Sequence, residues 1–176
     1  MKHLIIIIYE IYNREFIGKL LLALKLNTKN FPVLLIPNNS YGDCHYVLRT
    51  IHNIIPKNSI IIDKSMDSVT YKFLQKDSIL DKFKYTSCDA EGFCFSYENE
   101  ERELRSYLPF AEKITKVFTW GNKDYNFLKE KFKKNNINEN NVVKTGNICY
   151  DICKKKYRDI FKKELTNEVN LIKNEK

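Results

Sequence analysis

Apolar residues along this chain fall either into short continuous runs or into longer stretches with helical spacing. The first run, at residues 4–8, is a leucine followed by four isoleucines. A continuous run of this kind is typical of a strand buried on both faces of a parallel sheet. Over residues 14–26 the apolar residues recur at helical spacing, which predicts a helix capped by Asn13.

The same alternation of runs and periodic stretches continues through most of the chain. Further strands are predicted at residues 31–36, 59–62, 85–88, 116–120 and 142–144. Helices are predicted from Ser40 or Asp43 to residue 55, at 66–74, 99–112 and 124–134, and from Asp151 almost to Lys176. This order predicts an α/β fold, a Rossmann-like open parallel sheet of about six strands with helices on both faces. We assign it residues 1–165, and expect residues 166–176 to be a polar helical tail or the start of a linker to a second domain.

Length and charge narrow the classes of protein and partner. The chain has 176 residues, enough for one domain with a hydrophobic core, and a formal net charge of +8. That charge favours anionic partners, such as phosphorylated substrates, although lysines on a solvated surface give the same balance. The two most basic stretches, 129–134 and 154–163, lack the basic and aromatic alternation of an RNA-binding sheet. We therefore expect no nucleic-acid partner.

Cysteine usage and the first apolar run bear on location. The chain has five cysteines and no CxxC pair, which predicts free thiols in a reducing cytoplasm and no metal site. The run at residues 4–9 is shorter than the roughly 20 residues that cross a bilayer, and no signal-peptide cleavage site follows it. We expect a cytoplasmic protein, with peripheral contact between its basic surface and the anionic inner membrane as a further option. His45 and His52 share one predicted helix and are expected at the surface.

Polar residues cluster directly after several predicted strands. The clusters are Arg14-Glu15, Lys64-Ser65, Asp89 to Gly92, Trp120-Gly121 and Thr145-Gly146-Asn147 with Asp151. The carboxyl ends of parallel strands share one edge of a sheet, where ligands bind in open α/β folds. We therefore expect these clusters to converge on one cleft, although loops are polar in any case.

Each cluster allows a chemical and a structural interpretation. Asp89 and Glu91 offer a general base for a substrate hydroxyl, or they cap a turn. Lys64 and Ser65 suit a phosphate or carboxylate, or Ser65 starts a helix. Gly146 lets the backbone approach a ligand or a crossing helix, and Asn147 either lines an anion site or only caps the next helix. The sequence has neither a P-loop motif nor GxGxxG.

In this order and spacing, the pieces resemble the bacterial surface carbohydrate (capsule and lipopolysaccharide) biosynthesis family. The resemblance covers roughly residues 3–165, and family members look like two-domain glycosyltransferases of the GT-B type. The matching pieces are Arg14-Glu15-Phe16, Leu21-Leu22-Ala23, Lys64-Ser65, Asp89-Ala90-Glu91-Gly92, Phe118-Thr119-Trp120-Gly121 and Thr145-Gly146-Asn147-Ile148-Cys149-Tyr150-Asp151. Two departures are Ala90, where the family has a second acid, and Ile148-Cys149, where it has Pro-Arg. A similar layout occurs in UDP-N-acetylglucosamine 2-epimerases.

The resemblance implies a function in surface polysaccharide biosynthesis. The chain would be the acceptor-side domain of a glycosyltransferase that moves a sugar from a nucleotide-sugar to a glycan or lipid-linked acceptor, with a C-terminal partner domain or chain. It implies no metal and no cofactor besides the nucleotide-sugar substrate. Catalysis would fall to Asp89 and Glu91. Substrate binding would fall to Arg14, Glu15, Lys64, Ser65, Gly92, Trp120, Gly121, Thr145, Gly146, Asn147 and Asp151. A non-catalytic sugar- or nucleotide-binding or assembly module and a UDP-N-acetyl-sugar 2-epimerase-like fragment are the alternatives.

Overall fold

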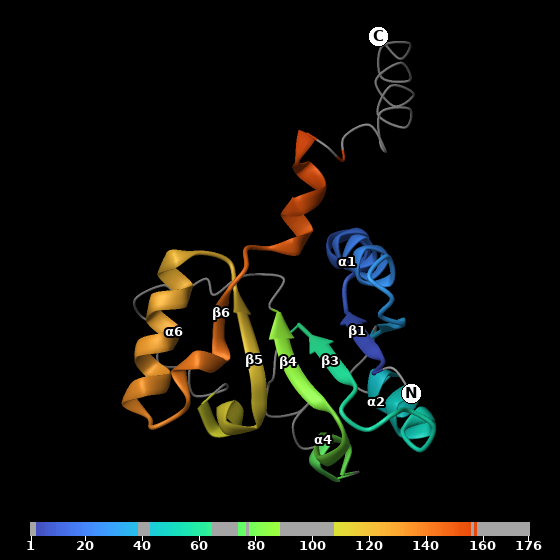
Figure 1. Ribbon diagram of the computed structural model, residues 1–176, viewed down its shortest axis with the longest axis horizontal. Helices are drawn as coiled ribbons and strands as arrows, with labels where there is room; N and C mark the ends of the chain where they lie inside the picture. The colour runs from blue at the N-terminus through green and yellow to red at the C-terminus, as the bar shows by residue number, and fades with distance from the viewer. Residues whose placement is uncertain are drawn as a thin grey trace.

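A six-stranded, all-parallel sheet forms the centre of the molecule (Figure 1). The computed structural model describes residues 3–38, 43–64, 74–76, 78–88, 108–155 and 157. The strand order is β2-β1-β3-β4-β5-β6. This arrangement confirms the predicted Rossmann-like α/β fold.

The strands are short and pair in parallel. They are β1 (Ile5–Tyr9), β2 (Val33–Pro37), β3 (Ile60–Asp63), β4 (Lys84–Cys88), β5 (Ile114–Thr119) and β6 (Val142–Lys144). Ile6 of β1 pairs with Leu34 of β2 on one side and with Ile61 of β3 on the other. The pairing of β4 with β5 contains one register shift, between Tyr85 and Thr86. The predicted and observed strands agree to within two residues at each end, because β-branched runs favour extended backbone wherever they begin.

Helices lie on both faces of the sheet. Residues of α1 (Ile17–Asn27) pack in one cluster with Ile5 and Ile7 of β1. Residues of α2 (Asp43–Ile51), α4 (Ile79–Lys82) and α6 (Asn122–Lys134) pack in a larger cluster on the opposite face. This division follows from right-handed crossovers, because the chain moves one way from β1 to β2 and the other way from β3 onward.

Several local predictions differ from the structure. The helix predicted from residue 14 begins with a π-helical turn, η1 (Tyr12–Phe16), whose N-cap position is Ile11, so Asn13 does not cap it. The helix predicted from Asp151 does not begin there, because a 3₁₀ helix, η4 (Ile148–Cys153), is followed by extended backbone at Lys154. Lys155 and Tyr157 are helical, and the rest of the predicted range lies outside the described residues. The short helix α4 was not predicted. The predicted helices at 66–74 and 99–112 lie largely outside the described residues. Of the second range, residues 108–112 are described and belong to a 3₁₀ helix, η2 (Leu108–Lys113).

The expectation that His45 lies at the surface is wrong. Its exposed fraction is 8%. On α2, His45 lies next to Cys44 and one turn before Leu48, and both of these belong to the core cluster. The buried stripe of a helix is broad enough to include His45 beside Cys44 and Leu48. The spacing between His45 and His52 therefore did not predict the burial of His45.

The sheet's two faces are covered unequally. On the face that carries α2, α4 and α6, Ile61 and Val117 are buried, with exposed fractions of 0% and 1%. On the other face, Ile60, Ile62 and Phe118 remain half-buried and line a cavity. Among the described residues, α1 and η4 are the helical elements that border this cavity. The cavity lies over β3, β4 and β5.

Candidate functional site

The predicted site residues that the structure describes all follow the carboxyl ends of strands. Arg14 and Glu15 come after β1, Lys64 after β3, Trp120 and Gly121 after β5, and Thr145, Gly146, Asn147 and Asp151 after β6. Because all strands run parallel, these residues lie along one edge of the sheet. Ser65, Asp89, Glu91 and Gly92 lie outside the described residues. Their predicted roles stay predictions.

The direction of strand addition reverses between β1 and β3. Open α/β sheets bind ligands at such a switch point, outside the carboxyl ends of the strands. Here Lys64 Nζ lies 2.6 Å from Glu10 Oε2, in an ion pair that joins the ends of the two strands. Both side chains are partly exposed, at 20% for Lys64 and 38% for Glu10. Lys64, which the sequence suggested as an anion-binding residue, therefore lies at the switch point, where it is paired with the Glu10 carboxylate.

Glu15 is buried, and its carboxylate already accepts hydrogen bonds from the protein. Lys19 Nζ donates at 2.9 Å, the Glu10 N–H at 3.0 Å and the Arg14 guanidinium at 3.2 Å. Burial by itself raises the pKa of this carboxyl, but the Lys19 charge and these hydrogen bonds outweigh it and leave the pKa below its ordinary value. This is the pattern of a structural carboxylate, which links η1 to the residue after β1 and to Lys19 of α1.

Lys19 is the unpredicted member of this group. Its side chain is 2% exposed, and its ammonium also donates to Ile8 O at 2.6 Å. A buried lysine needs such partners, because an unpaired charge away from water is very costly. In the sequence, Lys19 precedes the apolar run Leu20 to Leu24 and lies four residues after Glu15. That spacing was the available signal for the pair.

Gly18 is a second residue whose importance the sequence did not reveal. A Cβ at this position would lie 2.7 Å from Cys149 Cα, closer than real Cβ atoms approach other atoms. The glycine therefore allows η4 to contact α1 directly. Burial against α1 raises the pKa of the Cys149 thiol, although the nearby Lys19 charge opposes the shift.

Thr145, Gly146 and Asn147 form the turn that carries the chain from β6 into η4. The N–H groups of Thr145 and Gly146 both donate to Thr119 O, each at 3.0 Å. Gly146 has a φ of 91°, a conformation that suits glycine. Asn147 Oδ1 accepts from the Cys149 N–H at 2.7 Å. The cap predicted as one role of Asn147 is thus present.

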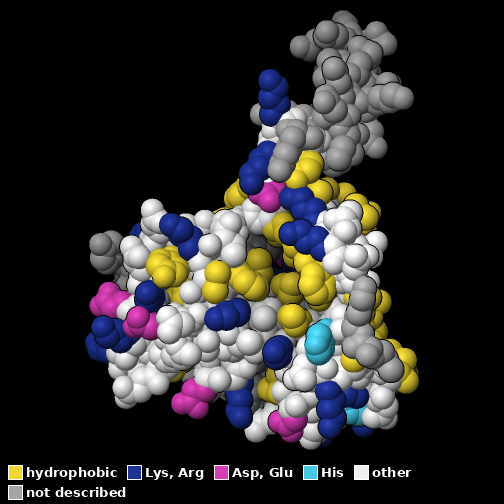
Figure 2. All heavy atoms as spheres, in the orientation of Figure 1, with side chains coloured by type: hydrophobic (Ala, Val, Ile, Leu, Met, Phe, Trp, Pro, Cys, Tyr) yellow, Lys and Arg dark blue, Asp and Glu magenta, His cyan; other side chains and the backbone are white. Residues whose placement is uncertain are grey.

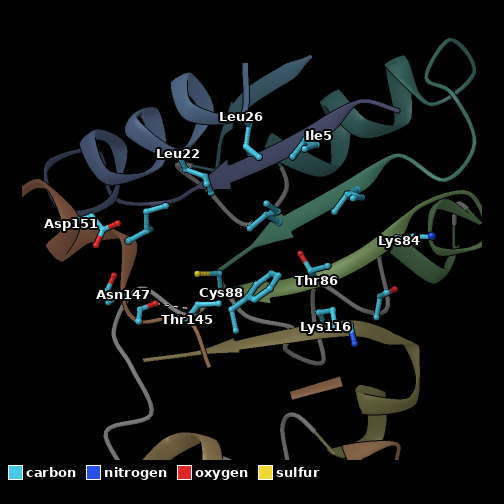
Figure 3. Close-up of a pocket in the computed structure, with 16 residues that line it drawn as sticks. Ile5, Leu22, Leu26, Lys84, Thr86, Cys88, Lys116, Thr145, Asn147 and Asp151 are labelled. Carbon is cyan, nitrogen blue, oxygen red and sulfur yellow. Dashed lines mark hydrogen bonds between the residues drawn. The ribbon is translucent and has the colours of Figure 1, made fainter. Parts of the chain in front are cut away.

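The cavity on the open sheet face ends at this turn. Its volume is about 480 Å³, and its floor is formed by β3, β4 and β5 with α1 along one side (Figure 3). Thr145, Gly146, Asn147 and Asp151 line its carboxyl end, close to Cys88 (Figure 3). Lys84 and Lys116 lie at the opposite end (Figure 3). In the space-filling view the cavity is a recess flanked by hydrophobic side chains (Figure 2).

The structure therefore brings together only part of the predicted site. The four motif residues from Thr145 to Asp151 share the cavity wall, whereas Arg14, Glu15, Lys64 and Trp120 do not line it. Trp120 instead packs edge-on against Tyr150 of η4, with ring centroids 5.5 Å apart. Asp151 Oδ1 forms an ion pair with Lys154 Nζ, and the two atoms are 2.5 Å apart. The buried hydrogen bond from Tyr85 to Asp63, on the opposite face of the sheet, was not predicted.

The described residues contain neither a metal site nor a membrane span. Within the described ranges, no group of three or more His, Cys, Asp or Glu side chains is placed to hold a metal ion. No helix in that part of the chain is long and apolar enough to cross a bilayer. No protein-family model matches the sequence, and no curated protein matches it significantly. The class of protein defined here is a Rossmann-like α/β domain with a cavity that reaches its carboxyl edge.

Proposed function

We propose that this chain is the acceptor-side domain of a GT-B-type glycosyltransferase in surface polysaccharide biosynthesis. In this proposal it helps to move a sugar from a nucleotide-sugar to a glycan or lipid-linked acceptor in the cytoplasm, next to the inner membrane. The observation that carries the proposal is the position of the Thr-Gly-Asn-x3-Asp motif. Its four defining residues line the carboxyl mouth of one cavity, at the edge where α/β sheets bind ligands.

Within this mouth, each motif residue has a chemical role in the proposal. Gly146 lets a ligand come close to the backbone, because it has no side chain to obstruct the approach. Asn147 and Asp151 offer an amide and a carboxylate to sugar hydroxyls. Asp89 or Glu91, which follow β4, would supply the base that activates the acceptor hydroxyl. Arg14 and Lys64 would attract the anionic groups of the substrates.

Transfer also needs a positioned donor. We assign that role to a C-terminal partner domain or chain, because holding both reactants in place supplies much of the rate enhancement in a two-substrate reaction. The leaving diphosphate would be stabilised by helix N-termini and basic side chains without a metal ion.

A non-catalytic sugar- or nucleotide-binding module is the second candidate, and one observation favours it. Three of the described carboxylates near the carboxyl edge form ion pairs with protein cations. Glu10 pairs with Lys64, Glu15 with Lys19 and Asp151 with Lys154. In this proposal the catalytic base is assigned to Asp89 or Glu91, which follow β4.

The test is binding and turnover of a panel of nucleotide-sugars by the purified chain. We expect at least one nucleotide-sugar to bind, and Asp151→Asn to weaken that binding about tenfold, the effect of losing one charge-assisted hydrogen bond. Asp81→Asn, on α4 across the sheet, is the matched control and should leave binding unchanged. Titration calorimetry measures both.

Turnover separates the two candidates. Sugar transfer or donor consumption that appears when the C-terminal partner domain or chain is added supports the glycosyltransferase. Glu91→Gln should abolish this turnover. Binding without turnover under both conditions supports the non-catalytic module. Absence of binding by every member of the panel at millimolar concentration contradicts both.

A further inference from the structure

An exposed aromatic ring lies at the start of η1, shortly after the end of β1. The exposed fraction of Tyr12 is 58%. Its ring is stacked on Phe16, with ring centroids 4.7 Å apart and an angle of 18° between the ring planes. Because Phe16 covers one face of the Tyr12 ring, the opposite face and the ring edges account for this exposure. The carboxyl edge of the sheet therefore presents a flat aromatic face.

The surroundings of this stack hold it in place. The Tyr9 ring packs against Phe16 at an angle of 60°, with centroids 5.2 Å apart, and both residues are half-buried. Phe16 directly follows Glu15, whose buried carboxylate accepts from Lys19 Nζ at 2.9 Å. A ring that is already held in position loses little conformational entropy when a ligand stacks on it, so the open face of Tyr12 is suited to binding.

The position and the neighbours of Tyr12 indicate the kind of ligand. The ring follows β1 at the switch point of the sheet, where open α/β folds bind ligands. An aromatic face is electron-rich and attracts the slightly positive C–H groups on the apolar face of a sugar ring. Glu10, two residues before Tyr12, and its partner Lys64 are both partly exposed. They provide an acceptor and a donor for sugar hydroxyls, which can both donate and accept.

The charges after β1 favour a neutral sugar ring over a nucleotide. Direct phosphate binding uses cations or backbone N–H groups at the start of a helix. Here the Glu10 N–H donates to the Glu15 carboxylate at 3.0 Å. Arg14, Lys19 and Lys64 each form an ion pair with one of these two glutamates. Direct phosphate contacts would have to compete with these interactions, whereas a neutral sugar leaves them intact.

We propose that the open face of Tyr12 stacks against a neutral pyranose ring of the acceptor, with the Lys64–Glu10 pair available to the hydroxyls of that ring. The inference rests on the proposed function, which it deepens by naming what the acceptor side recognises. Tyr12 does not line the cavity whose mouth contains Asp151. Acceptor binding at Tyr12 and nucleotide-sugar binding at Asp151 can therefore be tested separately.

The test is binding of the methyl glycosides of glucose, galactose and N-acetylglucosamine to the full chain, measured by NMR titration. We expect at least one glycoside to bind, and Tyr12→Ala to weaken its binding about tenfold because the stacking face is lost. Tyr12→Leu, which keeps an apolar side chain against Phe16 but has no aromatic face, should weaken it similarly. Tyr12→Phe retains the ring and should stay within about twofold of the unchanged chain.

Tyr46→Ala is the matched control. Tyr46 is 75% exposed on α2, across the sheet from α1, so its loss should leave glycoside binding unchanged. Equal affinities of the unchanged chain and Tyr12→Ala would overturn the inference, as would the absence of binding by every glycoside at tens of millimolar. Circular dichroism verifies that each variant is folded.

Two further titrations distinguish this inference from its alternatives. If Tyr12→Ala weakens the binding of uridine monophosphate and leaves glycoside binding unchanged, the inference is overturned in favour of a nucleobase site. Glycoside binding that depends on Tyr12, without binding of any nucleotide-sugar, supports the stacking role and contradicts the proposed function. Nucleotide-sugar binding that depends on Asp151, with no effect of Tyr12→Ala on the glycosides, supports the proposed function and overturns the stacking role.

Discussion

Glu15 and Lys19 form an ion pair that is almost completely withdrawn from water. Their side chains are 0% and 2% exposed. Each has further partners, so the pair forms the centre of a small network at the end of β1. Removing one member of a buried pair is more damaging than removing both, because the remaining charge stays buried without compensation. This asymmetry makes the pair testable.

We expect Glu15→Leu and Lys19→Met each to lower the free energy of unfolding by about 3–5 kcal/mol. The double variant should lose clearly less than the sum of the two, with a coupling of at least ~1 kcal/mol. Urea unfolding of the four proteins gives these values. Losses that simply add would mean that the two side chains do not depend on each other.

Gly18 is the other residue whose effect is decided by a single contact. Gly18→Ala places a methyl group against the Cys149 backbone, and we expect it to cost about 1–3 kcal/mol through overpacking. Gly121→Ala is the matched control, since no heavy atom lies within 4 Å of its ideal Cβ and its backbone is extended. Its effect should stay below about 1 kcal/mol. Thermal or urea unfolding distinguishes the two, and equal losses would contradict the proposed close contact between α1 and η4.

At the scale of elements, the turn between β6 and η4 connects the sheet edge to α1. Its backbone is held by Thr119 O on one side and by the Asn147 side chain on the other. The side-chain oxygen of an Asn or Asp at this position mimics a backbone turn, so its chemistry rather than its size matters. The orientation of η4, and with it the cavity wall, depends on this local bond.

We therefore expect Asn147→Ala to destabilise the protein by about 1 kcal/mol, the usual cost of a lost cap. Asn147→Asp retains an acceptor for the Cys149 N–H and should be nearly neutral. The alkylation rate of Cys149, followed by mass spectrometry, should rise in the alanine variant because η4 separates more easily from α1. The idea fails if alanine and aspartate behave alike.

The elements also show what sequence patterns can and cannot predict. The strands were predicted closely, because a run such as residues 4–8 has few alternatives to a doubly buried strand. The π-helical turn before α1 and the break after η4 were missed. Both lie where the chain makes contacts outside the ordinary helical period, since Glu15 accepts from the Glu10 N–H five residues earlier and Cys149 packs on Gly18 in a distant part of the chain. Local periodicity contains no information about such partners.

For the whole molecule, the buried network links stability to pH. The pKa of Glu15 is lower in the folded protein than its ordinary value. The unfolded state therefore binds its proton first as the pH falls, so the stabilisation is complete above the ordinary carboxyl range and disappears as the pH drops through the folded pKa. The molecule should lose stability in acid for this reason.

We expect the urea midpoint to fall between pH 5 and pH 3, and the fall to be smaller in Glu15→Gln, which cannot titrate. Glu139→Gln is the control, because Glu139 pairs with Lys129 at the surface, at 3.6 Å, where such pairs contribute little. It should follow the unchanged protein. An identical pH profile for Glu15→Gln and the unchanged protein would contradict the assigned role of the buried carboxylate.

The sequence by itself determined the α/β class, the parallel sheet and the edge on which the candidate residues lie. These features follow from apolar runs, helical spacing and the alternation of the two, all of which are local. Only the tertiary structure decided which of those residues share a cavity. It placed Thr145, Gly146, Asn147 and Asp151 in one wall, and it enclosed Glu15 in a network with Lys19. Such choices depend on which side chains meet after the sheet forms, and burial then determines which charges must be paired.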